Sequence, residues 1–295
     1  MNIGLVGLFG SSARRDFGYV RDFAQTIEAA GFSSLWVPDH VVFFPPDDLK
    51  SDYPYDAAGK PPWQSDDFGI FDPLFVIAAA APYTTTLRFS TSVLILPQRP
   101  ALLTAKEVVT LDHLTQGRFE FGVGGGWLRE EYEALGTSWA RRGKRFDEYI
   151  EAIRAAWTQD LASYEGEFVS FENVVLTPKP VNPGGPPFLI GGDSVAAMRR
   201  AARLGDGWYG WWSGYELEPQ LETLSRELAK EGRAVTDDNF QLKLGMPVDT
   251  GPEEVAAKVE LARRLGIEEL VVAAPIGTRD LRRDIEHWAD ILGVS

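Results

Sequence analysis

The chain has 295 residues, of which 44% are hydrophobic and 24% are charged, and it contains no cysteine. This composition is typical of a globular domain, and the lack of thiols excludes a disulfide framework, a thiolate metal site and a cysteine nucleophile. The formal net charge of −14 repels phosphate backbones, so nucleic acid is not an expected partner. The length suits one large α/β barrel.

No segment predicts a secretory leader or a membrane span. Residues 1–7 lack a basic region followed by a small-residue cleavage site, which a signal peptide needs. The longest apolar run, near residues 75–82, is too short to cross a bilayer. The absence of cysteine fits a reducing compartment, and we expect a cytoplasmic protein that does not bind membranes.

The first half of the chain alternates short apolar segments with amphipathic ones. The apolar run at residues 2–9 predicts a buried strand, and residues 16–30 predict a helix that Gly31 ends. Asp72 and Pro73 form a helix start, with the aspartate as N-cap and the proline in the first turn. The other elements of this half are strands at 33–37, 87–96 and 118–123, and helices at 72–83, 100–114 and 144–158.

The second half repeats this alternation. Eight strands alternating with eight helices favour a closed parallel (β/α)8 TIM barrel of the α/β class over an open sheet. The first strand is not followed by G-x-G-x-x-G, which argues against a Rossmann domain. We expect a single domain over residues 1–295. The elements of this half are strands at 188–190, 207–209, 240–246 and 269–274, and helices at 195–204, 217–230, 252–265 and 280–292.

Two segments interrupt the alternation, after the second and fourth predicted strands. Residues 43–69 are rich in Pro, Asp and Gly, and a loop of that length in a compact domain is typical of a lid or binding loop. Its aromatic residues favour a fairly apolar substrate, and we interpret Phe44 and Trp63 as substrate contacts. Residues 163–177 predict a small β insertion with the pattern of a hairpin.

His40 follows the second predicted strand and is one of three histidines. The other two, His113 and His287, fall within predicted helices. Barrel enzymes carry their chemistry at the carboxyl ends of the strands, so His40 is a candidate to exchange a proton near neutral pH. A loop histidine tied to the backbone is the alternative. No H-x-H or H-x-x-x-H spacing indicates a metal site, and no serine lies in a G-x-S-x-G turn.

Three consecutive glycines, Gly124 to Gly126, follow the fourth predicted strand and precede Trp127. Backbone that runs into glycines bends sharply or passes close to another group. Gly124 and Gly125 are therefore candidate cofactor contacts, with an ordinary glycine-rich turn as the alternative. Trp127, and Trp211 near the sixth strand, are candidate aromatic walls for a substrate.

The sequence Gly191-Gly192-Asp193-Ser194 leads from the fifth predicted strand into a helix. The unpaired N–H groups and the dipole of a helix start attract anions, and a phosphate is the expected occupant. Asp193 or Ser194 also suits the helix N-cap, and the two roles are compatible. The sequence shows no catalytic carboxylate pair and no metal cluster, so these strand ends suit an organic cofactor that carries the chemistry itself.

Five motifs, taken as a set, resemble the luciferase-like monooxygenase superfamily, and within it the oxidoreductases that use the deazaflavin coenzyme F420. The resemblance covers nearly the whole chain, and it implies a (β/α)8 barrel with insertions. The motifs lie in residues 34–40 (S-L-W-V-P-D-H), 92–100, 117–131, 142–148 (R-G-K-R-F-D-E) and 187–208.

The resemblance implies a role for each matching position. His40 corresponds to the active-site histidine beside the reactive carbon of the deazaflavin, and Asp39 to the neighbour that holds the ring region. Ser92 and Val93 resemble a pair joined by a non-prolyl cis peptide that supports the ring from behind. Residues 191–194 resemble the phosphate seat.

The family therefore implies an enzyme that transfers a hydride between coenzyme F420 and a small organic substrate. Because the two cofactors share a flavin-like ring and a phosphate, an FMNH2-dependent monooxygenase is the alternative. A non-catalytic flavin-binding protein is a third possibility. Trp127 stands where the sugar-phosphate dehydrogenase branch carries Glu, which argues against a reaction on glucose 6-phosphate. Relatives are often dimers, so we expect a homodimer.

Overall fold

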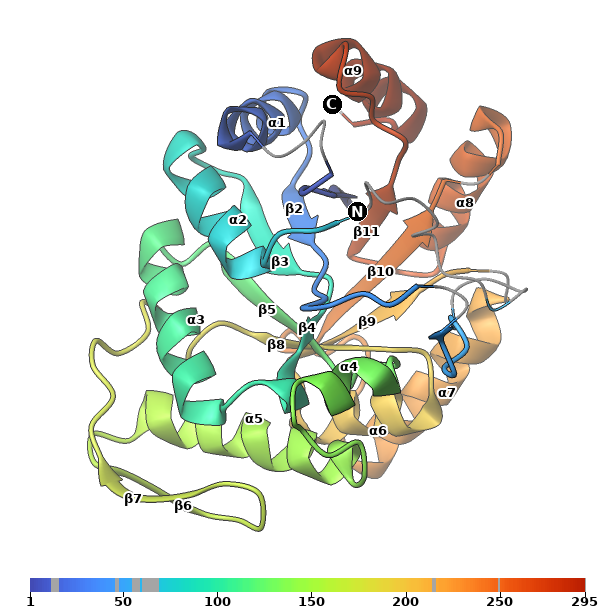
Figure 1. The fold of residues 1–295 in the computed structure, drawn as a ribbon. Coiled ribbons are helices and arrows are strands. Elements are labelled where there is room, and N and C mark those ends of the chain that lie inside the picture. Colours follow the sequence, from blue (N-terminus) through green and yellow to red (C-terminus); the bar gives the residue numbers. More distant parts are fainter. Residues whose placement is uncertain are drawn as a thin grey trace.

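A closed ring of parallel strands forms the centre of the computed structural model, which describes residues 1–11, 16–45, 48–54, 59, 69–213, 216–248 and 250–294 (Figure 1). The strands follow the order β3-β2-β1-β11-β10-β9-β8-β5-β4, and pairing of β3 with β5 closes the ring. The predicted (β/α)8 barrel is confirmed. Its strands are β1 (Asn2–Val6), β2 (Ser34–Val37), β3 (Arg88–Thr91), β4 (Leu94–Ile95), β5 (Phe119–Gly124), β8 (Phe188–Gly191), β9 (Gly207–Trp211), β10 (Gln241–Pro247) and β11 (Glu269–Ala273).

Helices surround the ring and cover its outer face (Figure 1). The predicted caps are present: Leu74 N–H donates to Asp72 Oδ1 (2.9 Å), and Gly31 follows the first helix with φ of +90°, a conformation that glycine adopts without a steric penalty. The helices are α1 (Phe17–Ala29), α2 (Pro73–Ala80), α3 (Ala101–Thr115), α4 (Arg129–Ala134), α5 (Arg142–Thr158), α6 (Val195–Leu204), α7 (Leu217–Lys230), α8 (Pro252–Arg264) and α9 (Leu281–Leu292), with short 3-10 turns η3 (Ala81–Tyr83) and η4 (Leu96–Gln98).

Three differences from the prediction are larger than the small shifts of the other element boundaries. The strand predicted at 87–96 is divided into β3 and β4, because the chain leaves the ladder at residues 92–93 before it pairs with β5 again. The strand predicted at 2–9 ends at Val6. The acidic segment after Trp127 forms the short helix α4, which spans less than two turns and therefore carries no periodic signal.

The second insertion is an antiparallel hairpin of β6 (Ala162–Glu165) and β7 (Ser170–Val174). It extends from the end of α5 at the outside of the ring (Figure 1), so the predicted β insertion is confirmed. Of the first insertion, 43–69, the structure describes 43–45, 48–54, 59 and 69, and its role as a lid stays a prediction. None of the helices in the described part of the chain has the length and apolarity needed to cross a bilayer.

A buried ionic network fills the barrel near the amino ends of its strands. Glu269 accepts from Arg88 Nη2 (2.8 Å) and lies 3.0 Å from Lys243 Nζ. Lys243 also pairs with Glu120. Ser34 Oγ donates to Glu269 Oε1 (2.8 Å). We call these residues the base network, because they lie at the base of the barrel. Its two carboxylates and two cations balance each other's charge.

Candidate active site at the barrel mouth

Apolar side chains form the floor of the barrel mouth, at the carboxyl ends of the strands. The ring of Trp36 stacks on Tyr209 with centroids 4.4 Å apart and planes 23° apart. Trp36 Nε1 donates to Ser34 Oγ (2.8 Å), so the base network fixes this ring from below. The cluster consists of buried Trp36, Leu189, Tyr209 and Val271, with partly buried Val6, Val93 and Trp211 packed against it.

The Ser92–Val93 peptide is cis, as the resemblance implied. The oxygens of Ser92 and Tyr209 lie 3.0 Å apart, within hydrogen-bond distance. The side chain of Val93 lies between the ends of two neighbouring strands. A Cβ at Gly124 would lie 2.4 Å from Val93 Cγ2, and a Cβ at Gly191 would lie 2.7 Å from Val93 Cγ1. These two glycines therefore make room for Val93, a constraint that the sequence did not reveal.

Gly125 differs from Gly124, since a Cβ there would meet only Phe146 at 3.8 Å. That distance is an ordinary van der Waals contact. Direct contact of Gly124 and Gly125 with a cofactor stays a prediction.

His40 lies among aromatic rings just after β2. The ring of Phe43 lies 5.3 Å from that of His40, and the ring of Trp127 lies 5.8 Å away in an edge-on arrangement. The side chain of His40 is 15% exposed. Trp127, predicted as a wall for the substrate, thus lies beside the predicted proton-exchanging group, and the ring of Tyr53 lies 5.3 Å from that of Trp127.

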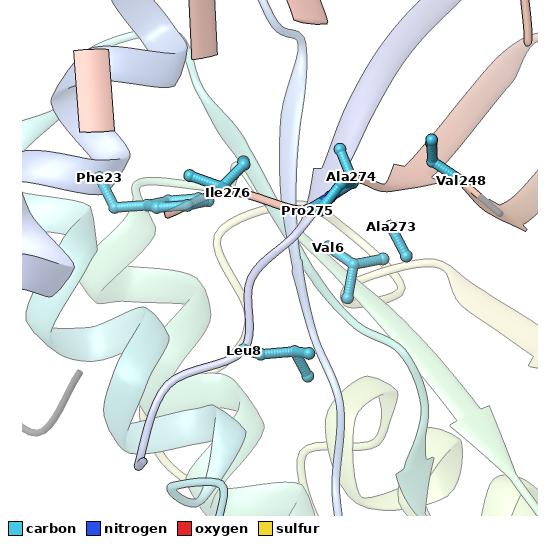
Figure 2. A pocket seen from close by; sticks show the side chains of 8 residues that line it. All are labelled: Val6, Leu8, Phe23, Val248, Ala273, Ala274, Pro275 and Ile276. Atoms are coloured by element: carbon cyan, nitrogen blue, oxygen red, sulfur yellow. The ribbon is translucent and has the colours of Figure 1, made fainter. Parts of the chain in front are cut away.

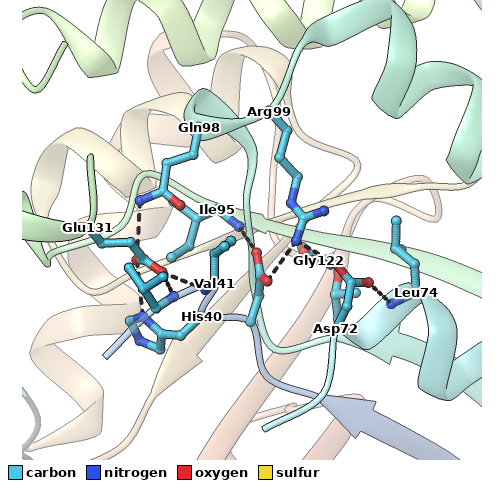
Figure 3. Close-up of polar contacts among 12 residues, drawn as sticks. His40, Val41, Asp72, Leu74, Ile95, Gln98, Arg99, Gly122 and Glu131 are labelled. Atoms are coloured by element: carbon cyan, nitrogen blue, oxygen red, sulfur yellow. Dashed lines mark hydrogen bonds and ion pairs between the residues drawn. The ribbon is translucent and has the colours of Figure 1, made fainter. Parts of the chain in front are cut away.

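Glu131, on α4, binds the ring of His40 and the backbone that follows it (Figure 3). Its Oε2 lies 3.1 Å from His40 Nδ1 and accepts from Gln98 Nε2 (3.2 Å). Its Oε1 accepts from Val41 N–H (2.6 Å) and Val42 N–H (3.3 Å). Burial acts to raise the pKa of the Glu131 carboxyl, but the hydrogen bonds and charge of His40, with the donors Val41 and Gln98, outweigh it and lower the pKa. Glu131 is therefore a carboxylate at neutral pH.

The carboxylate of Asp39 binds β4 and the residue that follows its 3-10 turn. Its Oδ2 accepts from Ile95 N–H (2.9 Å), and its Oδ1 accepts from Arg99 Nη2 (2.9 Å). Arg99 also donates to Asp72 Oδ2 (2.9 Å), the N-cap of α2. In this structure Asp39 thus supports the segment that follows Val93, and its role in holding a ring stays a prediction.

The start of α6 lies at the carboxyl end of β8, where the phosphate seat is predicted. Ser194 caps the helix by accepting from Ala197 N–H (3.2 Å), so the N-cap alternative is confirmed for Ser194. Asp193 Oδ1 accepts from Trp211 N–H (3.0 Å) and joins the ends of β8 and β9. Gly192 has φ of +120°. The role of residues 191–194 in binding a phosphate is compatible with this geometry and stays a prediction.

The remaining predicted substrate residues are spread along the mouth. Trp211 packs against the floor cluster at the end of β9, and Phe44 is half-buried in the loop after β2. Trp63 lies outside the described residues. Among the residues that the structure describes, no group of three or more acidic or histidine side chains is arranged to hold a metal ion.

A cavity of about 250 Å³, lined by residues with apolar side chains, opens beside the ends of β1, β10 and β11 (Figure 2). Val6 belongs both to its lining and to the floor cluster. The cavity therefore adjoins the mouth at the strand next to that of His40, because β1 pairs with β2. Its lining residues are Val6, Leu8, Phe23, Val248, Ala273, Ala274, Pro275 and Ile276.

The family model described as luciferase-like monooxygenase matches residues 1–289. The chain belongs to the luciferase-like monooxygenase family. Members of this family are oxidoreductases and monooxygenases, which supports the interpretation of this chain as an enzyme. Among its relatives are an uncharacterized protein of Mycobacterium tuberculosis, 38% identical over 225 residues (76% of each chain), and an FMNH2-dependent dimethylsulfone monooxygenase of Pseudomonas fluorescens, 39% identical over 202 residues (62% of this chain and 54% of the relative).

Two solved structures share the fold at low sequence identity. A coenzyme F420-dependent tetrahydromethanopterin reductase from Methanopyrus kandleri superimposes with a TM-score of 0.76 at 15% identity, covering 99% of this chain and 98% of that one. The monooxygenase RslO1 from Streptomyces bottropensis gives a TM-score of 0.74 at 19% identity, with the same coverage. The same barrel thus carries proteins named for F420 and proteins named as monooxygenases.

Proposed function

We propose that the protein is a coenzyme F420-dependent oxidoreductase that transfers a hydride between the deazaflavin and a small organic substrate. One observation carries the proposal: His40 lies at the end of a barrel strand, is held by Glu131, and stays partly exposed at an apolar mouth. A histidine so placed is suited to exchange the proton that accompanies hydride transfer. The similarity in fold to an F420-dependent reductase supports this cofactor class.

The residues of the mouth fit a flat ring with a phosphate-bearing tail. The stacked pair Trp36 and Tyr209, with Val93 beside it, offers an apolar surface to a ring. The first turn of α6, after Gly192, offers backbone N–H groups to a phosphate. When bound, the deazaflavin would supply the hydride transfer.

The rest of the chemistry falls to the chain itself. His40 would take up or release one proton, while Trp127 and Phe43 shield its ring from water. The apolar cavity beside β1 would seat an apolar part of the substrate (Figure 2), because burial of apolar surface is favourable by about 25 cal/mol per Å².

Binding and turnover test the proposal together. Oxidised coenzyme F420 should bind in a one-to-one ratio, and a screen of cyclic enones and alcohols should identify a substrate. His40→Ala should keep cofactor binding and lose at least about a hundredfold in turnover, the low end for loss of general acid–base catalysis. The control is His113→Ala, whose ring contacts the Lys179 carbonyl on the outside of the barrel. Unchanged turnover in His40→Ala would rule out this role.

The second candidate is an FMNH2-dependent monooxygenase. The observation that favours it is the 39% identity over 202 residues to the dimethylsulfone monooxygenase of Pseudomonas fluorescens. Parallel fluorescence titrations with F420 and FMN, followed by oxygen consumption with reduced FMN, separate the two candidates. Tighter binding of FMN together with substrate-dependent oxygen uptake would replace the F420 proposal.

A further inference from the structure

Helix α4 carries two adjacent glutamates that bind the same loop at different places. Glu130 Oε1 accepts from Lys50 N–H (2.5 Å) and Ser51 N–H (3.1 Å), and its Oε2 accepts from Ser51 Oγ (2.7 Å). Glu131 instead accepts from Val41 and Val42, at the start of the loop. Both side chains therefore hold the loop after β2 to α4, but only Glu131 also reaches the ring of His40.

The surroundings of Glu131 consist of hydrogen donors. A carboxylate offers about four acceptor positions, and four groups contact it: the Nδ1 of His40, the amide of Gln98, and two backbone N–H groups. The Glu131 side chain is 0% exposed, so it has no water to compensate for a lost partner. Such a site suits the ionised carboxylate and fixes its orientation.

This arrangement determines where His40 carries its proton. An ionised carboxylate only accepts hydrogen bonds, so the nitrogen that faces it, Nδ1, is the donor. In the neutral imidazole one nitrogen is the donor and the other the acceptor, which makes Nε2 the acceptor. When Nε2 takes up a proton, the ring becomes an imidazolium, and the carboxylate 3.1 Å from Nδ1 balances its charge.

We propose that Glu131 is the positioning residue of this site: it fixes the Nδ1–H tautomer and the orientation of His40, so that Nε2 exchanges the proton of the substrate. The catalytic part of this inference rests on the proposed function, because it requires His40 to exchange a proton during turnover. The tautomer itself does not depend on which cofactor or substrate binds.

Nitrogen NMR tests the tautomer directly. The chain has only three histidines, so ¹⁵N-histidine labelling gives three rings, with His113 and His287 as internal references for folding. At a pH of about 8, above the ordinary histidine range, the wild-type spectrum should show His40 as the Nδ1–H form. A wild-type ring in the Nε2–H form would overturn the proposal without any variant.

Two variants of neighbouring residues complete the test. Glu131→Gln replaces one accepting oxygen with an NH2 group, which can only donate and must then face hydrogen-bond donors. His40 should therefore lose the pure Nδ1–H signature in Glu131→Gln. Glu130→Gln should keep that signature. Once a substrate is known, kcat of Glu131→Gln should fall by about a hundredfold or more with KM within a few-fold, because the orienting carboxylate is gone. Glu130→Gln should lose much less kcat than Glu131→Gln, because Glu130 binds Lys50 and Ser51 and only Glu131 contacts the ring of His40.

The readouts separate failure of this proposal from failure of the proposed function. A folded Glu131→Gln protein that keeps the Nδ1–H form, or that keeps wild-type kcat, contradicts the positioning role. An unchanged kcat in His40→Ala contradicts the proposed function instead, and the NMR result then still decides the tautomer. If Glu131→Gln does not fold, Gln98→Leu leaves the carboxylate in place and should keep the Nδ1–H form; loss of that form in folded Gln98→Leu would contradict the proposal.

Discussion

Each end of the barrel holds a buried glutamate beside a nitrogen base, and the two pairs differ in exposure. In the base network the side chains of Lys243 and Glu269 are 2% and 1% exposed. At the mouth the side chain of Glu131 is 0% exposed, but that of His40 is 15% exposed. A nitrogen group without exposed surface cannot exchange a proton with a ligand. The two pairs therefore have different roles. The base network supports the fold, and the pair at the mouth is suited to chemistry.

The first prediction concerns the structural role of the base network. Of the variants proposed, Lys243→Met should lose the most stability. Removing this ammonium leaves Glu120 and Glu269 in the barrel with Arg88 as their remaining cationic partner, and breaking a buried ion pair costs about 3–5 kcal/mol. Urea unfolding measures it. The surface variant Arg282→Met, whose pair with Glu286 spans 3.8 Å between exposed side chains, should stay near wild type. A loss below about 1 kcal/mol in Lys243→Met would contradict the account.

The second prediction is a loss of stability in acid. Burial acts to raise the pKa of Glu269, but Lys243, Arg88 and the hydroxyls of Ser33 and Ser34 outweigh it and lower the pKa to about 2, from an ordinary value of 4.5. A carboxyl with a lowered pKa in the folded state contributes stability above pH 4.5, and that contribution is lost as the pH falls from 4.5 towards 2.

Urea unfolding across this pH range is the measurement. Glu269→Gln should be less stable at neutral pH and should show a flatter pH dependence, because the titrating group is gone. Equal slopes in the variant and the wild type would assign the acid sensitivity to other carboxyls.

The fold could be predicted from the sequence because each barrel strand is a short apolar run followed by a helical pattern. Two features of the fold could not be predicted, and each has a physical reason. The division of β3 from β4 leaves no trace in composition, since residues 89–96 are apolar or small throughout. Helix α4 is six residues long, too short for a periodic signal.

The site was predictable at single positions and not in its contacts. His40 could be selected because its place after β2 is a property of the local sequence. Its partner Glu131 lies 91 residues further on, and only the closure of the barrel brings the two together. Asp39 shows a second limit: it adjoins His40, yet its carboxylate contacts β4 and Arg99 instead, a direction that residue type does not determine.

The third prediction asks whether the floor of the mouth is packed as tightly as the base. In Gly124→Ala the new Cβ would lie 2.4 Å from Val93 Cγ2, so overpacking should cost about 1–3 kcal/mol in the protein without cofactor. Gly125→Ala is the control, because its Cβ would meet only Phe146 at 3.8 Å. Val93→Ala removes the clashing methyl groups, so the double variant should lose less stability than the sum of the two single variants. Strict additivity would show that Val93 is not the obstacle.

The fourth and smallest effect concerns the apolar cavity, which has no counterpart in the base network. Ala273→Leu places a larger side chain in this space of about 250 Å³ (Figure 2). If the cavity seats an apolar part of the substrate, the preference in kcat/KM for an alkyl-substituted cyclohexenone over cyclohexenone itself should fall about tenfold, since each buried methylene is worth about 0.8 kcal/mol. Stability and cofactor binding should hardly change.

The control for this effect is Ala229→Leu, which adds the same side chain at an exposed position on α7. An equal loss of preference in both variants, or none in Ala273→Leu, would exclude the cavity from substrate binding. A selective loss in Ala273→Leu would instead extend the functional mouth from β2 to the ends of β1, β10 and β11. The division between the two ends would then rest on what each encloses: balanced charges at the base, and apolar space beside a proton-exchanging ring at the mouth.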